Sequence, residues 1–120
     1  MYTVYLADDE QLIREGLAET IPWESLRMRL VGTAEDGRHA LRGIREHKPD
    51  IVLTDIRMPY LDGLELIGKI REVHPSCRVV IISGHGEFTY AQSAIQLGVS
   101  DFILKPVDVT SLCRRLAKLT

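Results

Sequence analysis

The chain has 120 residues, 45% hydrophobic and 27% charged, which suits one globular domain with one core. A formal net charge of −2 gives no electrostatic basis for nucleic-acid binding, so any such contact is expected from a segment outside this sequence. No apolar run approaches the ~20 residues of a membrane span, and the N-terminus lacks the basic region of a signal peptide. Cys77 and Cys113 form no metal or redox motif, so we expect free thiols in a cytoplasmic, reducing setting.

In the first half of the chain, short apolar runs alternate with amphipathic segments. From the N-terminus we expect a strand, a helix, a strand, a helix and a strand at residues 2–7, 12–21, 30–34, 37–48 and 51–55. Pro22 ends the first helix, and Asp36 opens the second. Ile51 to Thr54 is apolar until its last residue, which is typical of a central parallel strand covered on both faces.

The second half continues the alternation with a helix, a strand, a helix, a strand and a helix at residues 64–73, 78–83, 88–97, 101–104 and 109–116. Pro59 and Asp62-Gly63 mark the loop before the first of these helices, and Gly98 closes the helix that precedes the last strand. Five strands alternating with five helices predict an α/β fold, with a doubly wound parallel sheet covered on both faces.

Polar residues collect where the expected strands end, and ligands of doubly wound sheets bind outside the carboxyl ends of the strands. Four of the five strands end in, or are followed directly by, these groups: Asp8-Asp9-Glu10, Asp55, Ser83 and Lys105-Pro106. Carboxylates that meet at one edge repel each other unless a cation neutralises them. Magnesium prefers oxygen ligands of this kind, so we expect an Mg²⁺ site at Asp8, Asp9 and Asp55.

Lys105 and Ser83 extend this acidic site toward phosphate chemistry. A lysine and a hydroxyl suit the oxygens of a transferring phosphoryl group, while Asp55 suits the role of nucleophile. Because Asp55 is already ionised at neutral pH, the site requires no histidine as base. His85 follows Ser83 closely, and either a contact with the phosphodonor or a solvated loop position fits it.

Taken together, these residues resemble the receiver domain of two-component response regulators over the whole chain. The matching segments are residues 5–10, 50–59, 61–63, 80–84 and 102–106. The resemblance implies a flavodoxin-like strand order of 2-1-3-4-5. It also implies that Asp55 accepts a phosphoryl group from the phosphohistidine of a sensor histidine kinase.

The resemblance further assigns roles within the site. Asp9 would bind Mg²⁺ directly, Asp8 mainly through water, and Arg57 through its backbone carbonyl. Ser83 and Lys105 would contact phosphoryl oxygens, and the Lys105-Pro106 peptide bond would be cis. Ser83 and Phe102 would form the switch, with the fourth helix, fifth strand and fifth helix as output face.

A finer resemblance links the chain to receivers of AraC-type (YesN-like) bacterial regulators. It rests on residues 83–95, 21–23 and 105–108. Those regulators carry a C-terminal helix-turn-helix module that binds DNA. Residues 1–120 would then be the receiver domain alone, with DNA binding left to a further domain.

The sequence departs from the commonest receiver pattern at the switch. Ser83 replaces the more frequent threonine, and Phe102 stands where many receivers have tyrosine, so a switch that needs a phenolic hydroxyl is in doubt. Asp101 with Arg114 or Arg115 offers ion pairs for a phosphorylation-dependent homodimer.

Three alternatives share parts of this pattern. A phosphatase resembling the haloacid-dehalogenase group needs a second aspartate two positions after the nucleophile, where this chain has Arg57. A flavin or nucleotide module needs a glycine-rich or hydroxyl-rich loop after the first strand, where Asp8 and Asp9 would repel phosphate. A receiver that folds but is never phosphorylated also remains open.

Overall fold

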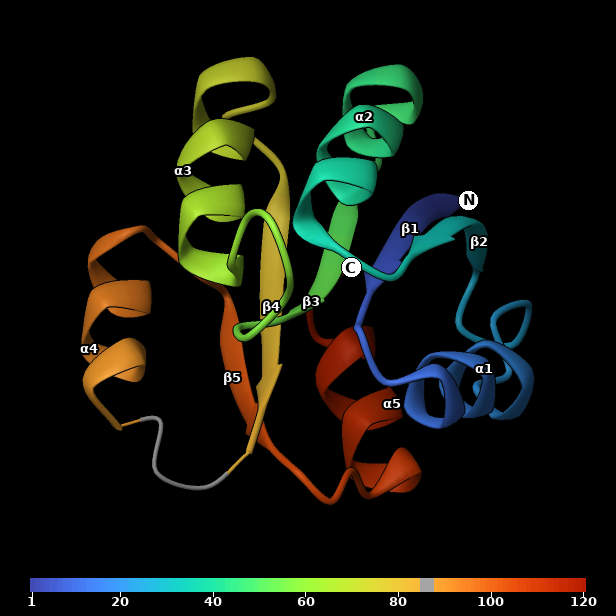
Figure 1. Ribbon diagram of the computed structural model, residues 1–120. Coiled ribbons are helices and arrows are strands. Elements are labelled where there is room, and N and C mark those ends of the chain that lie inside the picture. The colour runs from blue at the N-terminus through green and yellow to red at the C-terminus, as the bar shows by residue number, and fades with distance from the viewer. Residues whose placement is uncertain (85–87) are drawn as a thin grey trace.

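Five parallel strands form one sheet with helices on both faces (Figure 1). The computed structural model describes residues 1–84 and 88–120. The strands are β1 (Tyr2–Ala7), β2 (Met28–Ala34), β3 (Ile51–Asp55), β4 (Arg78–Ser83) and β5 (Asp101–Leu104). The helices are α1 (Gln11–Thr20), α2 (Gly37–His47), α3 (Gly63–Val73), α4 (Phe88–Gln96) and α5 (Val109–Ala117). The strand order β2-β1-β3-β4-β5 confirms the expected flavodoxin-like α/β fold.

The core consists of two apolar layers, one on each face of the sheet, because successive strand residues point to opposite faces. In β4, Val79 and Ile81 belong to the layer covered by α2, α3 and α4. Val80 and Ile82 belong to the layer covered by α1 and α5, which lie side by side in Figure 1. This alternation in a central strand accounts for its continuously apolar sequence.

Strand register brings the polar residues of the sequence to one edge of the sheet. Ala7 pairs with Thr54 across β1 and β3, and Ser83 pairs with Leu104 across β4 and β5. Asp55 is the last residue of β3 and pairs with Ile82. The strand order changes direction at β1 and β3, which is where ligand sites of such sheets form.

The start of β2 and the exposure of two helical residues differ from the sequence-based expectation. β2 begins at Met28, two residues earlier than expected, because Met28 is buried, pairs with Tyr2, and donates its N–H to the carbonyl of Trp23 at 2.8 Å. Leu12 and Ile95 fit the helical spacing, yet they are 87% and 73% exposed. Helical spacing therefore located the helices but assigned two exposed residues to the side that faces the core.

The expectation of free thiols is confirmed. Cys77 is buried, and burial raises the pKa of its thiol to about 12. Cys113 is half-buried in α5, and desolvation raises its pKa as well. None of the helices in the described ranges has the length and apolar character needed to cross a membrane.

Candidate functional site

Asp55 lies at the carboxyl end of β3 with both carboxylate oxygens engaged. The residue as a whole is 6% exposed, and its Oδ1 accepts a 2.7 Å hydrogen bond from the backbone N–H of Ile56. Its Oδ2 accepts a hydrogen bond from Lys105 Nζ at 3.0 Å. Gly63, the first residue of α3, lies close to the backbone of Asp55, and a Cβ on Gly63 would lie 2.3 Å from the carbonyl oxygen of Asp55. The backbone around Asp55 is therefore closely packed.

Three further carboxylates surround this position, from Asp8, Asp9 and Glu10. One oxygen from each of them and from Asp55 lies within 4.8 Å of all the others. Asp8 is 1% exposed, and its Oδ1 accepts a 2.9 Å hydrogen bond from the N–H of Glu10. Burial, reinforced by the charge of Asp55, raises the pKa of Asp8 to about 6, and the same two causes raise the pKa of Asp9.

This donor set fits a hard divalent cation. Magnesium takes carboxylate oxygens and keeps several waters, and Asp9 and Glu10 leave the cluster open to solvent. The raised pKa values of Asp8 and Asp9 reflect burial first and the charge of Asp55 second, and such a cation would offset both. Asp8, Asp9 and Asp55 are thus brought together as expected from the strand ends.

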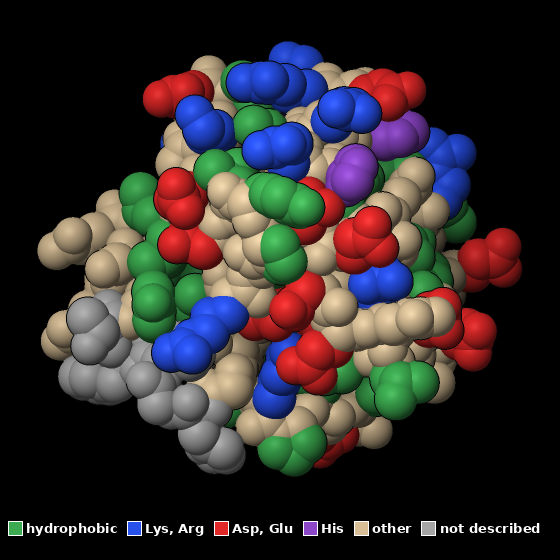
Figure 2. Space-filling view, viewed as in Figure 1, with side chains coloured by type: hydrophobic (Ala, Val, Ile, Leu, Met, Phe, Trp, Pro, Cys, Tyr) green, Lys and Arg blue, Asp and Glu red, His purple; other side chains and the backbone are tan. Residues whose placement is uncertain are grey.

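Lys105 follows β5 and carries the positive charge of the site. Its Nζ lies 3.0 Å from Asp55 Oδ2, 3.2 Å from Glu10 Oε1 and 3.3 Å from Asp8 Oδ2. Burial by itself would lower the pKa of Lys105. The hydrogen bond to Asp55 and the charge of Asp55 have the opposite effect, and together with the charge of Asp8 and the hydrogen bond to Glu10 they raise the pKa above its ordinary value. The Lys105–Pro106 peptide bond is cis. Figure 2 shows acidic and basic side chains gathered together near the centre of the face in view.

Ser83 ends β4 beside this group. Its carbonyl accepts a 2.7 Å hydrogen bond from the N–H of Lys105. The side chain is 1% exposed, and its Oγ has no hydrogen-bond partner among the residues that the structure describes. A buried hydroxyl without a partner costs about 1–3 kcal/mol, so a polar group that binds there would recover that cost.

The remaining candidate residues lie around the site. Arg57 is exposed in the loop two residues after Asp55. Phe102 in β5 is half-buried against the layer of α2, α3 and α4. Asp101 pairs with Arg115 of the same chain at 2.9 Å, so any use of these residues in a dimer would require them to exchange partners. His85 lies outside the described residues.

Sequence reasoning missed two features of the site. Glu10 was noted only as the neighbour of the acidic pair, although its carboxylate holds Lys105. Its position directly after Asp9 was the available signal. Gly63 was taken as a loop residue, yet it begins α3 beneath Asp55, with Asp62 as helix cap. Nothing local in the sequence indicates that approach.

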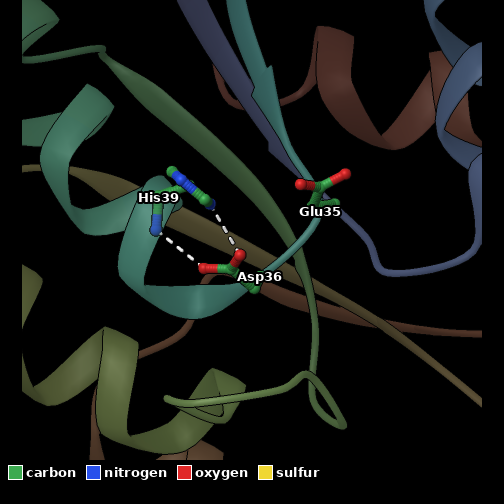
Figure 3. Close-up of side chains that lie close together, drawn as sticks. All are labelled: Glu35, Asp36 and His39. Carbon is green, nitrogen blue, oxygen red and sulfur yellow. Dashed lines mark hydrogen bonds and ion pairs between the residues drawn. The ribbon is translucent and has the colours of Figure 1, made fainter.

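A second cluster lies at the start of α2, from Glu35, Asp36 and His39 (Figure 3). Asp36 Oδ1 accepts a 2.8 Å hydrogen bond from the N–H of His39, and Asp36 Oδ2 lies 2.6 Å from the Nδ1 of that residue. Burial would raise the pKa of Asp36, but the hydrogen bonds from His39 lower it. Asp36 thus serves as the cap of α2, and the positive end of the helix dipole disfavours a cation there.

A doubly wound parallel sheet with an acidic pocket, a lysine and a buried hydroxyl at its carboxyl edge defines the class of receiver-like α/β domains. The family model for response regulator receiver domains matches residues 4–117, so the chain belongs to this family of regulatory domains.

Relatives of known sequence support this membership. The chain is 44% identical over 119 residues to the uncharacterized transcriptional regulatory protein YesN of Bacillus subtilis, covering 99% of the chain and 32% of the relative. It is 44% identical over 112 residues to the transcriptional regulatory protein HptR of Staphylococcus aureus, covering 93% of the chain and 44% of the relative. The chain therefore spans less than half the length of both relatives.

Solved structures agree with this assignment. The receiver domain of AraT, a response regulator from Geobacillus stearothermophilus, superimposes with a TM-score of 0.94 at 44% identity, covering 98% of this chain and 92% of that one. A complex of CheX, CheY, BeF₃ and Mg²⁺ from Borrelia burgdorferi has a TM-score of 0.88 at 28% identity, covering 98% and 88%. In both cases the similarity extends over nearly the whole chain.

Proposed function

We propose that this chain is the phosphoryl-accepting receiver domain of a two-component transcriptional regulator that acts in the cytoplasm. Asp55 accepts the phosphoryl group from a phosphohistidine of a sensor histidine kinase. The observation that carries the proposal is the pairing of Lys105 with Asp55 at 3.0 Å, at the strand edge where the buried hydroxyl of Ser83 lacks a partner among the described residues.

The reaction uses Asp55 as nucleophile. A carboxylate oxygen forms a bond to phosphorus, the bond from phosphorus to the imidazole nitrogen of the donor breaks, and the imidazole leaves as a neutral group once it has bound a proton. Lys105 donates to the oxygens of the transferring group, and the Ser83 hydroxyl gains an acceptor, which it lacks among the described residues.

Mg²⁺ is the cofactor that these residues fit. Asp8, Asp9 and Asp55 would hold it, with the backbone carbonyl of Arg57 as a further ligand. When bound, Mg²⁺ neutralises charge on the phosphoryl oxygens and on the carboxylates. Burial, and after it the charge of Asp55, raises the pKa of Asp8 and of Asp9, and a cation that offsets these two costs supports this assignment.

The output follows from the charge added to Asp55. A phosphoryl group adds a charge of about −1.5 to −2. The hydroxyl of Ser83 would move toward this group, and the space that it leaves beside β5 would admit the ring of Phe102. Phe102 also lines a groove of about 260 Å³ between β5 and α5, so its ring has room at the surface as well. The α4–β5–α5 face would change, promote a homodimer, and act on an AraC-type DNA-binding domain beyond residue 120.

The test is incubation with Mg²⁺ and acetyl phosphate, followed by intact-protein mass spectrometry. We expect the mass of one phosphoryl group to be added to the wild-type chain and not to Asp55→Asn. A wild-type chain that gains no mass would contradict the proposal and favour a receiver that is never phosphorylated. A gain that persists in Asp55→Asn would place the acceptor elsewhere, and sustained hydrolysis of simple phosphate esters would favour a phosphatase.

A further inference from the structure

The ammonium group of Lys105 is shared among three carboxylates that differ in their environment. It donates hydrogen bonds to Asp55 Oδ2 at 3.0 Å and to Glu10 Oε1 at 3.2 Å, and the Asp8 carboxylate lies 3.3 Å away. An ammonium group has only three N–H donors. A phosphoryl oxygen that needs a donor from Lys105 must therefore take it from one of these contacts.

Glu10 is the contact that can be released most easily. The side chains of Asp8 and Asp55 are 1% and 8% exposed, so an ammonium that leaves them abandons buried charge. The Glu10 side chain is 57% exposed, so water can take the place of the Lys105 ammonium beside it at little cost in free energy. Asp8 and Asp55 are also the carboxylates that a cation would engage, whereas Glu10 extends from the open side of the cluster.

We propose that Glu10 is a positioning residue that holds Lys105 in the unphosphorylated protein and competes with the phosphoryl group for its N–H donors. The proposal rests on the proposed function, because it concerns the lysine of the same site. Glu10 acts through Lys105 and not on the phosphoryl group itself. Because Lys105 must release Glu10 before it can donate to the phosphoryl group, the free energy of the Glu10–Lys105 pair is subtracted from the binding of that group. Glu10 therefore biases the domain toward the unphosphorylated state.

The experiment measures the dissociation constant of beryllofluoride, a phosphoryl mimic, by calorimetry at saturating Mg²⁺. Glu10→Gln should bind beryllofluoride roughly two- to fivefold more tightly than the wild type, the range expected for loss of a largely exposed ion pair. Glu19→Gln removes the same charge from an exposed position of α1 and should leave the constant unchanged. An unchanged constant in Glu10→Gln would overturn the proposal.

A double-mutant cycle separates action through Lys105 from a general effect of charge. In a Lys105→Ala background, Glu10→Gln should have no effect on beryllofluoride binding. The same two- to fivefold tightening there would show that Glu10 acts by its charge alone, and the positioning role would be wrong. Failure of the wild-type chain to bind beryllofluoride or to gain phosphoryl mass would instead contradict the proposed function.

A second measurement needs neither Mg²⁺ nor a phosphoryl mimic. In metal-free protein labelled with ¹⁵N-lysine, the ammonium signal of Lys105 is identified by its loss in Lys105→Ala. Glu10→Gln should increase the exchange of these ammonium protons with water, and Glu19→Gln should not. Equal exchange in the wild type and Glu10→Gln would show that Glu10 does not hold Lys105, whatever the binding data give.

Discussion

The strongest prediction concerns Asp8, because its buried carboxylate costs the metal-free protein stability. Asp8 is 1% exposed, and its pKa is raised by burial and by the charge of Asp55. Asp8→Asn removes the charge while keeping the size of the side chain. We therefore expect Asp8→Asn to be more stable than the wild type at pH 7 in the absence of divalent cations.

The magnitude follows from the folded-state pKa of Asp8, about 6, against an ordinary value of 3.8. Because the folded protein binds this proton more tightly, its stability falls as pH rises from about 4 through 6, and the loss is complete at pH 7. The difference corresponds to about 3 kcal/mol. The buried asparagine still loses about 1–2 kcal/mol by desolvation. A net gain of about 1–2 kcal/mol remains, or roughly 3–10 °C in Tm.

Thermal unfolding followed by circular dichroism in EDTA measures this gain. Its size should shrink as pH is lowered from 7 toward 4, where Asp8 of the folded wild type is protonated. Saturating Mg²⁺ should raise the Tm of the wild type more than that of Asp8→Asn, because only the wild type offers the full set of carboxylates. Glu24→Gln, at an exposed position, serves as control. A Tm of Asp8→Asn equal to or below that of the wild type at pH 7 in EDTA would refute the reasoning.

Two further substitutions test the packing and the hydroxyl of the site. Gly63→Ala would place a Cβ 2.3 Å from the carbonyl oxygen of Asp55, so we expect a loss of about 1–3 kcal/mol in urea unfolding, and a change below about 0.5 kcal/mol would contradict this close approach. Ser83→Ala removes a buried hydroxyl without a partner among the described residues, and should raise the free energy of unfolding by about 1 kcal/mol. The same variant should slow phosphorylation by acetyl phosphate roughly ten- to a hundredfold, since a hydrogen bond to a charged group contributes about 1.5–3 kcal/mol. A variant that is less stable and equally fast would argue against both roles of Ser83.

The sequence predicted which carboxylates and which lysine lie together, because parallel strands bring their carboxyl ends to one edge. Asp8, Asp55 and Lys105 are far apart in the chain, yet each follows or ends a strand that periodicity and composition located correctly. The register of β1, β3, β4 and β5 then places them together without further information. Fold and site were thus accessible through one topological rule.

What the sequence did not predict depends on contacts between segments distant in the chain. Helical spacing included Leu12 and Ile95, but whether an apolar residue of a helix is covered depends on neighbouring elements. The approach of Gly63 to Asp55 depends on the path of the whole loop before α3. The pairing of Glu10 with Lys105 requires side-chain positions at two strand ends, which no local pattern specifies.

The difference in burial between the thiols of Cys77 and Cys113 has a practical consequence for experiments that follow the switch. Only a thiolate that is accessible to reagent is alkylated rapidly, and burial with a pKa of about 12 protects Cys77. Cys113 is partly exposed, and its helix belongs to the proposed output face. The natural chain therefore offers a single attachment point for a spin label or fluorophore on α5. A probe there could report rearrangement of that helix on phosphorylation without the introduction of any new cysteine.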